Sequence, residues 1–332
     1  RKIINELLQY PDDTAGSLMT TEFIDLKEHL TVENAFETIK KKGLKKETVY
    51  NCYVLSMDRK LLGMIDIKEL LLADRNKLVT EIMDENVIKA NTLDDQEEVI
   101  KLFDKYDCIA LPVVDQENRL VGIITIDDVL DVVEEEATED MKKMAAITPI
   151  DKPYDKTGVF ETFFARIPWL VVLMISATFT GAIITSFEDK LAACTALTAF
   201  IPMLMNTGGN AGGQSSVSII RALSLNQIEL KDIFKVMFKE FRISILCAIV
   251  LAVCNFVKML IFDKVSMLIA ASVCITLFVT VIIAKLIGCV LPIFAKKLGF
   301  DPAVMASPFI TTIVDACSLL IYFEIATMII GL

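Results

Sequence analysis

The sequence predicts a protein in two parts, an α/β soluble module followed by an all-α membrane domain of five transmembrane helices. The charge changes near Arg166: residues 1–165 hold 21 Lys and Arg against 35 Asp and Glu, a net charge of −14, whereas residues 166–332 hold 12 against 9, a net charge of +3. The acidic half repeats itself at a spacing of about 60 residues. The other half contains five long apolar runs, which indicate membrane spans.

The repeat indicates two copies of one α/β unit. Residues 18–20 (LMT) match 82–84 (IMD), and residues 62–66 (LGMID) match 121–125 (VGIIT). Both copies of the second motif lead directly into a helical pattern. In the second copy, the apolar run 109–115 (IALPVVD) is typical of a buried strand.

These patterns predict the domain boundaries. The chain starts at Arg1 in the middle of a helical pattern and has no initiator Met, so we expect residues 1–17 to be the remnant of an N-terminal domain or linker. The predicted domains that follow are a first repeat copy over 18–78, a second over 79–140, a connecting, plug-like helix over 141–165 and the membrane domain over 166–332.

Each apolar run exceeds the roughly 20 residues that a transmembrane helix needs. Lys and Arg gather before the first run, in the second connection and in the fourth, which predicts that the soluble module is cytoplasmic. Five crossings then leave the C-terminus on the extracellular side of a multi-pass plasma-membrane protein. The predicted spans are 166–187, 191–223, 241–262, 267–295 and 304–331.

Catalytic and zinc-binding patterns are missing from the sequence. The eight cysteines form no C-x-x-C pair, and His29 is the only histidine. The sequence also has no phosphate-binding glycine loop and no nucleophile–base pair. We therefore expect neither an enzyme nor a nucleic-acid-binding protein.

Acidic residues accumulate at the end of the soluble module, where apolar residues between them indicate a helix. Like charges on one ordered surface repel each other, and divalent cations with oxygen ligands, Mg²⁺ or Ca²⁺, would relieve that repulsion. The sequence therefore predicts a site that senses divalent cations. Its acidic residues are Asp127, Asp128, Asp131, Glu134, Glu135, Glu136, Glu139 and Asp140.

The fifth span contains an acid at bilayer depth. Between residues 306 and 332 the only charged side chains are Asp315 and Glu324. A carboxylate there costs roughly 2.5–3.5 kcal/mol on insertion scales, so it is a candidate functional residue. At helical spacing it shares one stripe with Ser307, Thr311 and Ser318. Such a polar stripe is typical of a cation path, although an acid satisfied by a neighbouring helix is the alternative.

The second span is unusually polar. Residues 200–221 read FIPMLMNTGGNAGGQSSVSIIR. Its glycines have the spacing of close helix packing. Packing does not require Asn206, Asn210 and Gln214, which lie on one helical face. Glycines beside amide side chains can present oxygens to a cation or to its water shell.

The segment LPVVDQENRLVGIITIDDVLDVV resembles a tandem pair of CBS domains (cystathionine β-synthase modules), and the likeness extends over about residues 18–140. Such pairs often bind adenine nucleotides, with a hydroxyl and a carboxylate on the ribose. The first copy matches poorly, because Asp66 replaces the hydroxyl. The resemblance leaves two roles open, ATP binding and a dimerising scaffold without nucleotide. The matching residues of the second copy are Gly122, Thr125 and Asp128.

The glycine and amide motif of the second span and the Asp-Pro, Ser-Pro and Thr-Thr motifs before Asp315 resemble the MgtE family of magnesium channels. The resemblance covers essentially the whole chain. It implies a bacterial homodimer with a pore on the two-fold axis, in which Asp315 holds hydrated Mg²⁺. The other implied pore residues are Gly209 and Thr311, through their carbonyl oxygens, with Asn210 and Ser307. In many members an Asn stands where this chain has Gly213, and in some an Asn stands at the position of Ser307.

The resemblance also implies regulation. Cytosolic Mg²⁺ would bind the acidic residues, bridge subunits and the connecting helix, and close the pore. Asp301, in the fourth connection, would receive such a bridge from the membrane side. Two other functions remain open: an ion-coupled carrier for Co²⁺, Ni²⁺ or Mn²⁺, and a membrane receptor whose CBS domains sense adenine nucleotides.

Overall fold

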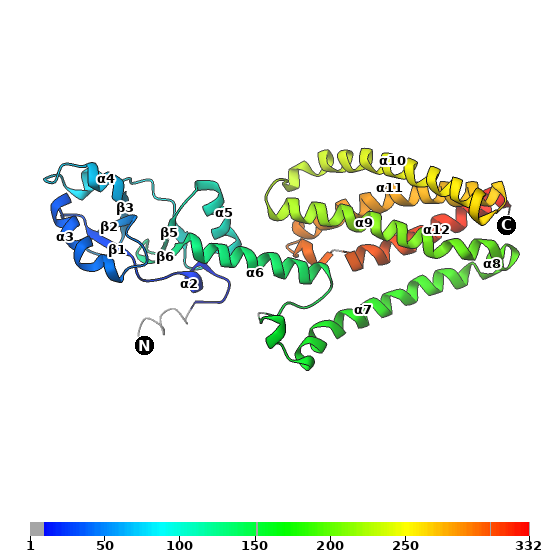
Figure 1. Ribbon diagram of the computed structural model, residues 1–332, viewed down its shortest axis with the longest axis horizontal. Coiled ribbons are helices and arrows are strands. Elements are labelled where there is room, and N and C mark those ends of the chain that lie inside the picture. Colours follow the sequence, from blue (N-terminus) through cyan, green and yellow to red (C-terminus); the bar gives the residue numbers. More distant parts are fainter. Residues whose placement is uncertain (1–9, 151, 306, 332) are drawn as a thin grey trace. The chain divides into compact units, whose positions relative to one another are not determined.

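A computed structural model describes residues 10–150, 152–305 and 307–331 of the chain, with the side chains of Met305 and Ser307 outside this description. The chain divides into two compact units, Arg1–Ala137 and Thr138–Leu332. The first contains strands and short helices, and the second contains long helices (Figure 1).

The first unit contains two three-stranded sheets built in the same way. In one, β1 (Ile24–Lys27) is parallel to β2 (Asn51–Leu55), and β3 (Leu61–Asp66) is antiparallel to β2. In the other, β4 (Ala90–Asn91), β5 (Ala110–Val114) and β6 (Leu120–Thr125) have the same order and directions. The sequence repeat is therefore a structural repeat. Its short helices are α2 (Ala15–Leu18), α3 (Val32–Lys42), η1 (Gly43–Lys45), α4 (Ile67–Leu72), η2 (Val79–Glu81) and α5 (Gln96–Tyr106).

A glycine in each copy allows another segment to cross the last strand closely. A Cβ at Gly122 would lie 2.8 Å from the carbonyl oxygen of Thr20, and one at Gly63 would lie 2.9 Å from that of Asp84. Only glycine allows a backbone approach this close. Side chains of both copies then share one buried cluster: Phe23, Tyr53, Leu55, Leu61, Ala110, Val114, Leu120 and Ile123.

The acidic segment is helical, as predicted, and forms α6 (Ile126–Met144). The predicted helix over 141–165 is wrong, because α6 ends at Met144 and the next long helix starts at Val159. Ala146 adopts a left-handed backbone with φ of 55°, which ends the helix. Pro149 and Pro153 then provide no backbone N–H, and among the described residues between the two helices only the short turn η3 (Tyr154–Lys156) forms.

The second unit consists of long helices joined by short turns. Four helices in the described part of the chain are long and apolar enough to cross a membrane: Val159–Ser186, Leu230–Asp263, Met267–Lys297 and Pro308–Ile330. The elements, in order, are α7 (Val159–Ser186), α8 (Glu188–Ala193), η4 (Thr195–Phe200), α9 (Ile201–Ser224), η5 (Leu230–Asp232), α10 (Ile233–Lys258), η6 (Met259–Asp263), α11 (Met267–Lys297), η7 (Pro302–Met305) and α12 (Ser307–Ile330).

The predicted second apolar span, 191–223, is not one apolar helix. It divides into α8, η4 and α9. The helix α9 has 24 residues but is not among the four helices that are apolar enough to cross a membrane. Its amides, glycines and serines lower its hydropathy. Five apolar spans were therefore predicted, whereas the described residues form four apolar helices and one polar helix of similar length.

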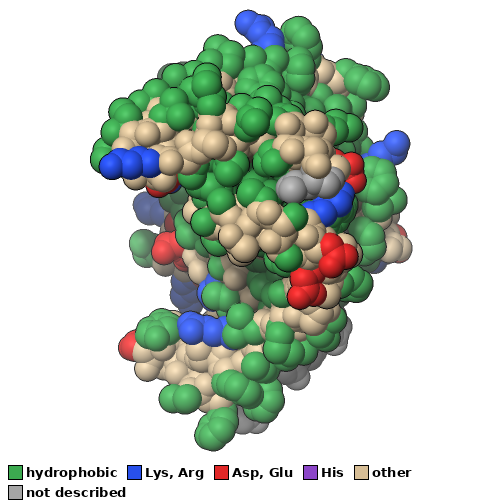
Figure 2. All heavy atoms as spheres, turned by 90° about the vertical axis from the view of Figure 1, so that its right-hand side faces the viewer, with side chains coloured by type: hydrophobic (Ala, Val, Ile, Leu, Met, Phe, Trp, Pro, Cys, Tyr) green, Lys and Arg blue, Asp and Glu red, His purple; other side chains and the backbone are tan. Residues whose placement is uncertain are grey.

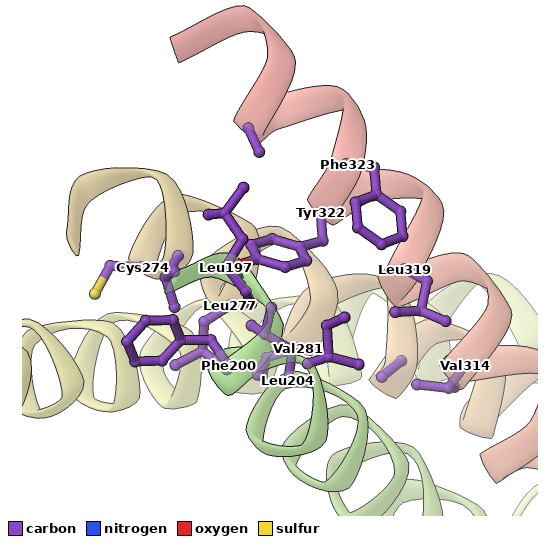
Figure 3. Packing of buried hydrophobic residues seen from close by; sticks show 14 of the residues in the cluster. Leu197, Phe200, Leu204, Cys274, Leu277, Val281, Val314, Leu319, Tyr322 and Phe323 are labelled. Carbon is purple, nitrogen blue, oxygen red and sulfur yellow. Dashed lines mark hydrogen bonds between the residues drawn. The ribbon is translucent and has the colours of Figure 1, made fainter. Parts of the chain in front are cut away.

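α9, α11 and α12 pack against one another, while α10 packs on α11 and α7 on α12 (Figure 1). Their apolar side chains form the core of this unit (Figure 3). At the end of the unit that carries α8, hydrophobic side chains are numerous and lie among polar and backbone atoms and a few charged groups (Figure 2). Core residues drawn in Figure 3 include Leu197, Phe200, Leu204, Cys274, Leu277, Val281, Val314, Leu319, Tyr322 and Phe323.

Candidate ion site in the helical unit

Glycines bring the backbone of α9 close to its two neighbours. A Cβ at Gly288 of α11 would lie 2.1 Å from the carbonyl oxygen of Gly212, so any side chain there would separate the helices. A Cβ at Gly208 would lie 2.8 Å from Thr280 of α11 and 2.9 Å from Val314 of α12. The glycines of α9 therefore serve close packing, as their spacing predicted.

The same packing places the α9 motif beside the α12 motif. A Cβ at Gly209 would lie 3.0 Å from Cγ2 and 3.5 Å from Oγ1 of Thr311. These two residues come from motifs about 100 residues apart, and both were predicted to line an ion path. The structure brings them into contact.

Asp315 lies one turn beyond Thr311 on α12. Thr311 and Ser318, on either side of it at helical spacing, both face glycines of α9. Asp315 is partly buried, and its Oδ1 is enclosed without a hydrogen-bond partner in the described part of the chain. A buried carboxylate oxygen without a donor is costly, and a cation or a water molecule beside it would remove that cost.

The predicted amide face of α9 consists of Asn206, Asn210 and Gln214, whose three side chains are exposed on the unit. Asn210 Nδ2 donates to Asn206 Oδ1 at 3.4 Å. Gly213, where many family members have an Asn, is buried instead. Amides cannot face lipid without loss of their hydrogen bonds, so this face requires water or another polar surface. The side chain of Ser307, also predicted at the site, lies outside the described residues.

The predicted regulatory acids are divided between paired and exposed residues. Thr125 Oγ1 donates to Asp128 Oδ2 at 2.7 Å, and Gln96 Nε2 donates to Glu136 Oε1 at 2.6 Å. No group of three or more His, Cys, Asp or Glu side chains in the described residues has the geometry of a metal site. Within one chain, the acids therefore do not form a complete cage. The exposed members are Asp127, Asp131, Glu134 and Glu135.

Asp301 has a partner that the sequence did not indicate. Lys143 Nζ lies 2.7 Å from Asp301 Oδ2 and also pairs with Glu139. Burial lowers the pKa of Lys143, but its hydrogen bonds to Asp301 and Glu139 outweigh burial and raise the pKa above its ordinary value. Asp301 Oδ1 also accepts from Ala303 N at 2.8 Å. The sequence could have suggested the pair of Glu139 and Lys143, which are four residues apart on one helix, but not the pair of Lys143 and Asp301.

The predicted nucleotide residues are close together. Thr125 is buried, and its Oγ1 donates to Asp128 Oδ2 at 2.7 Å. Gly122 has a packing role in the strand crossing described above.

Sequence reasoning missed a buried polar group between α9, α10 and α11. Glu240, Ser215 and Lys285 are all buried and linked by hydrogen bonds. One signal was available, because Lys285 is the only charged residue in the predicted span 267–295.

Comparisons with known proteins match the two parts of the chain to two different family models. The family model MgtE, described as a divalent cation transporter, matches residues 201–325, and the CBS domain model matches residues 15–76 and 79–135. The magnesium transporter MgtE of Thermus thermophilus is 39% identical over 329 residues, which cover 99% of this chain and 73% of that protein. The magnesium transporter MgtE of Bacillus subtilis is 39% identical over 326 residues, with coverages of 98% and 72%.

Among solved structures, the cytosolic domain of the Mg²⁺ channel MgtE in complex with ATP is 42% identical. It aligns with a TM-score of 0.39, over 40% of this chain and 53% of that one.

Proposed function

This chain belongs to the MgtE family of divalent cation transporters, and from that premise we propose that it carries Mg²⁺ across the bacterial plasma membrane along a path lined by α9 and α12. Its relatives are named magnesium transporters, in agreement with the prediction that the chain is not an enzyme.

One observation carries the proposed path: Gly209 packs against Thr311, one turn from the carboxylate oxygen of Asp315 that has no hydrogen-bond partner among the described residues. Mg²⁺ gives up its water reluctantly and binds oxygen in octahedral geometry. A carboxylate beside hydroxyl and backbone oxygens suits a hydrated Mg²⁺, which is held through its water molecules. Asn210 and Ser307 would complete the outer contacts.

The exposed amide face supports a homodimer. In a membrane, Asn206, Asn210 and Gln214 would be costly against lipid, whereas a second copy across a water-filled axis would keep them hydrated. Two copies of Asp315 would then face one path. Their mutual repulsion favours a divalent cation between them.

The five long helices, α9 included, would cross the membrane. The soluble module would lie in the cytoplasm and the C-terminus outside, because the connections on the module's side carry most of the Lys and Arg.

The acidic helix supports regulation by the transported ion. The exposed carboxylates of α6 would bind cytosolic Mg²⁺, and because none of them forms a cage within one chain, the ions would bridge two copies. Bridging would close the path at high Mg²⁺.

The Thr125–Asp128 pair supports ATP binding in the CBS module, which calorimetry with ATP would measure for the wild type and for Asp128→Ala.

Flux into liposomes tests the function. Purified chain should admit Mg²⁺ down its own gradient, without a gradient of a second ion, and Asp315→Ala should not. An obligatory second-ion gradient would instead indicate the coupled carrier.

A further inference from the structure

Three polar side chains from three helices meet inside the helical unit, away from the amide face of α9. Glu240 of α10, Ser215 of α9 and Lys285 of α11 are exposed by only 8%, 2% and 6%. Ser215 Oγ donates to Glu240 Oε2 at 2.7 Å, and Lys285 Nζ donates to Ser215 Oγ at 3.4 Å. One hydroxyl therefore connects a carboxylate to an ammonium group.

The surroundings of this group are apolar. Each of the three residues lies one helical turn from a residue of the same buried hydrophobic cluster. These neighbours are Ile219 on α9, Val236 on α10 and Cys289 on α11. A single buried charge in apolar surroundings has a high desolvation cost. The opposite charges of Glu240 and Lys285 offset that cost only while both stay close to Ser215. The helices are therefore held at the arrangement in which all three groups meet.

α9 needs such a constraint more than its neighbours do. Between Gly208 and Gly213, beside the amides, its close contacts with α11 and α12 are made largely through glycines, which allow close approach but provide little side chain to resist rotation about the helix axis. Ser215 lies five residues after Asn210, about 140° around the helix at roughly 100° per residue. A bond at Ser215 thus fixes the direction in which the amide face points.

We infer that Glu240, Ser215 and Lys285 form an anchor for α9 that sets the rotation of Asn206, Asn210 and Gln214 in the ion path. They are positioning residues for selectivity and do not contact the ion. The inference rests on the proposed path through α9 and α12.

Ser215→Ala tests the anchor most specifically. The variant frees α9, while the opposite charges on α10 and α11 still compensate each other, so the protein should fold. Loss of a hydrogen bond to charged groups shifts the equilibrium between rotations of α9 by about tenfold, so the ratio of Mg²⁺ to Ca²⁺ flux in liposomes should fall, by up to about tenfold. Ser216→Ala is the matched control, because the neighbouring hydroxyl is equally buried and has no hydrogen-bond partner in the described residues.

An unchanged flux ratio in folded Ser215→Ala would overturn the inference. If that variant aggregates, the double variant Glu240→Gln with Lys285→Met decides instead, since replacing both charges of a buried pair is often tolerated. The ratio should again fall, and a wild-type ratio would overturn the anchor. Asp315→Ala, measured in parallel, separates the two proposals. If it keeps wild-type flux, the path itself is wrong; if it is inactive while Ser215→Ala keeps the wild-type ratio, only the anchor is wrong.

Discussion

Lys143 Nζ lies 2.7 Å from Asp301 Oδ2 and also pairs with Glu139, so one ammonium group joins the end of α6 to the turn before α12. Next to it, Met144 packs in a small apolar cluster with Ile220 and Ala303. Asp301 and Glu139 are two of the acids predicted to bind regulatory Mg²⁺. A side-chain cation therefore occupies the place where a divalent cation would bridge them.

Lys143→Met should make the transporter more sensitive to cytosolic Mg²⁺, because the ammonium group no longer competes for Asp301 and Glu139. Partly exposed ion pairs are worth up to about 1 kcal/mol, so the Mg²⁺ concentration for half-inhibition should fall about two- to fivefold. Inhibition curves in liposomes measure it. Lys142→Met is the control, since Lys142 donates to the Ile150 carbonyl instead. An unchanged midpoint in Lys143→Met would contradict the competition.

The difference between Lys143→Met and the wild type should not depend on pH between 6 and 9. The pKa of Lys143 is raised, so the stability from its ion pairs is fully present below the unfolded-state pKa and is lost only as pH rises through the still higher folded-state pKa. Repeating the inhibition curves at pH 6, 7.5 and 9 checks this. A difference that disappears by pH 9 would show that the ammonium group is not held as described.

Neutralising the exposed acids of α6 should weaken inhibition without a loss of flux. The variant Asp131→Asn, Glu134→Gln and Glu135→Gln removes three exposed carboxylates from one helix face. We expect a severalfold higher Mg²⁺ concentration for half-inhibition. Asp58→Asn, Asp104→Asn and Glu117→Gln remove the same charge elsewhere on the first unit and should leave the midpoint unchanged. Equal midpoints in both variants would refute the sensing role of α6.

Gly288→Ala should destabilise the helical unit. The added methyl group would lie 2.1 Å from the Gly212 carbonyl oxygen, and neither can move without moving its helix backbone. Overpacking of this kind costs roughly 1–3 kcal/mol or more. Thermal unfolding in detergent, followed by loss of the monodisperse peak in size-exclusion chromatography, measures the effect. Gly181→Ala, on α7 with nothing within 4 Å, should be neutral or slightly stabilising. Similar melting temperatures for the two variants would contradict the α9–α11 contact.

Features that depend on periodicity could be predicted from the sequence. Apolar runs and the repeat indicated the two units, and helical spacing indicated the amide face of α9 and the polar stripe of α12. The end of α6 at Met144 could not be predicted, because it depends on the left-handed backbone of Ala146, whereas Pro149 and Pro153 already argued against one helix over 141–165. Nor could the pairs of Lys143 with Asp301 and of Lys285 with Ser215, since each joins residues that are distant in sequence and meet only after the helices pack.

The most direct test of the proposed function compares two acids of α12. Purified wild type, Asp315→Ala and Glu324→Gln are reconstituted at equal density, and initial Mg²⁺ influx into liposomes is measured without a second-ion gradient. Glu324 is exposed, outside the contact between Gly209 and Thr311, so its variant should keep wild-type influx. Asp315→Ala should lose at least about tenfold, the equivalent of roughly 1.4 kcal/mol. Wild-type influx through Asp315→Ala would contradict an ion path at this carboxylate.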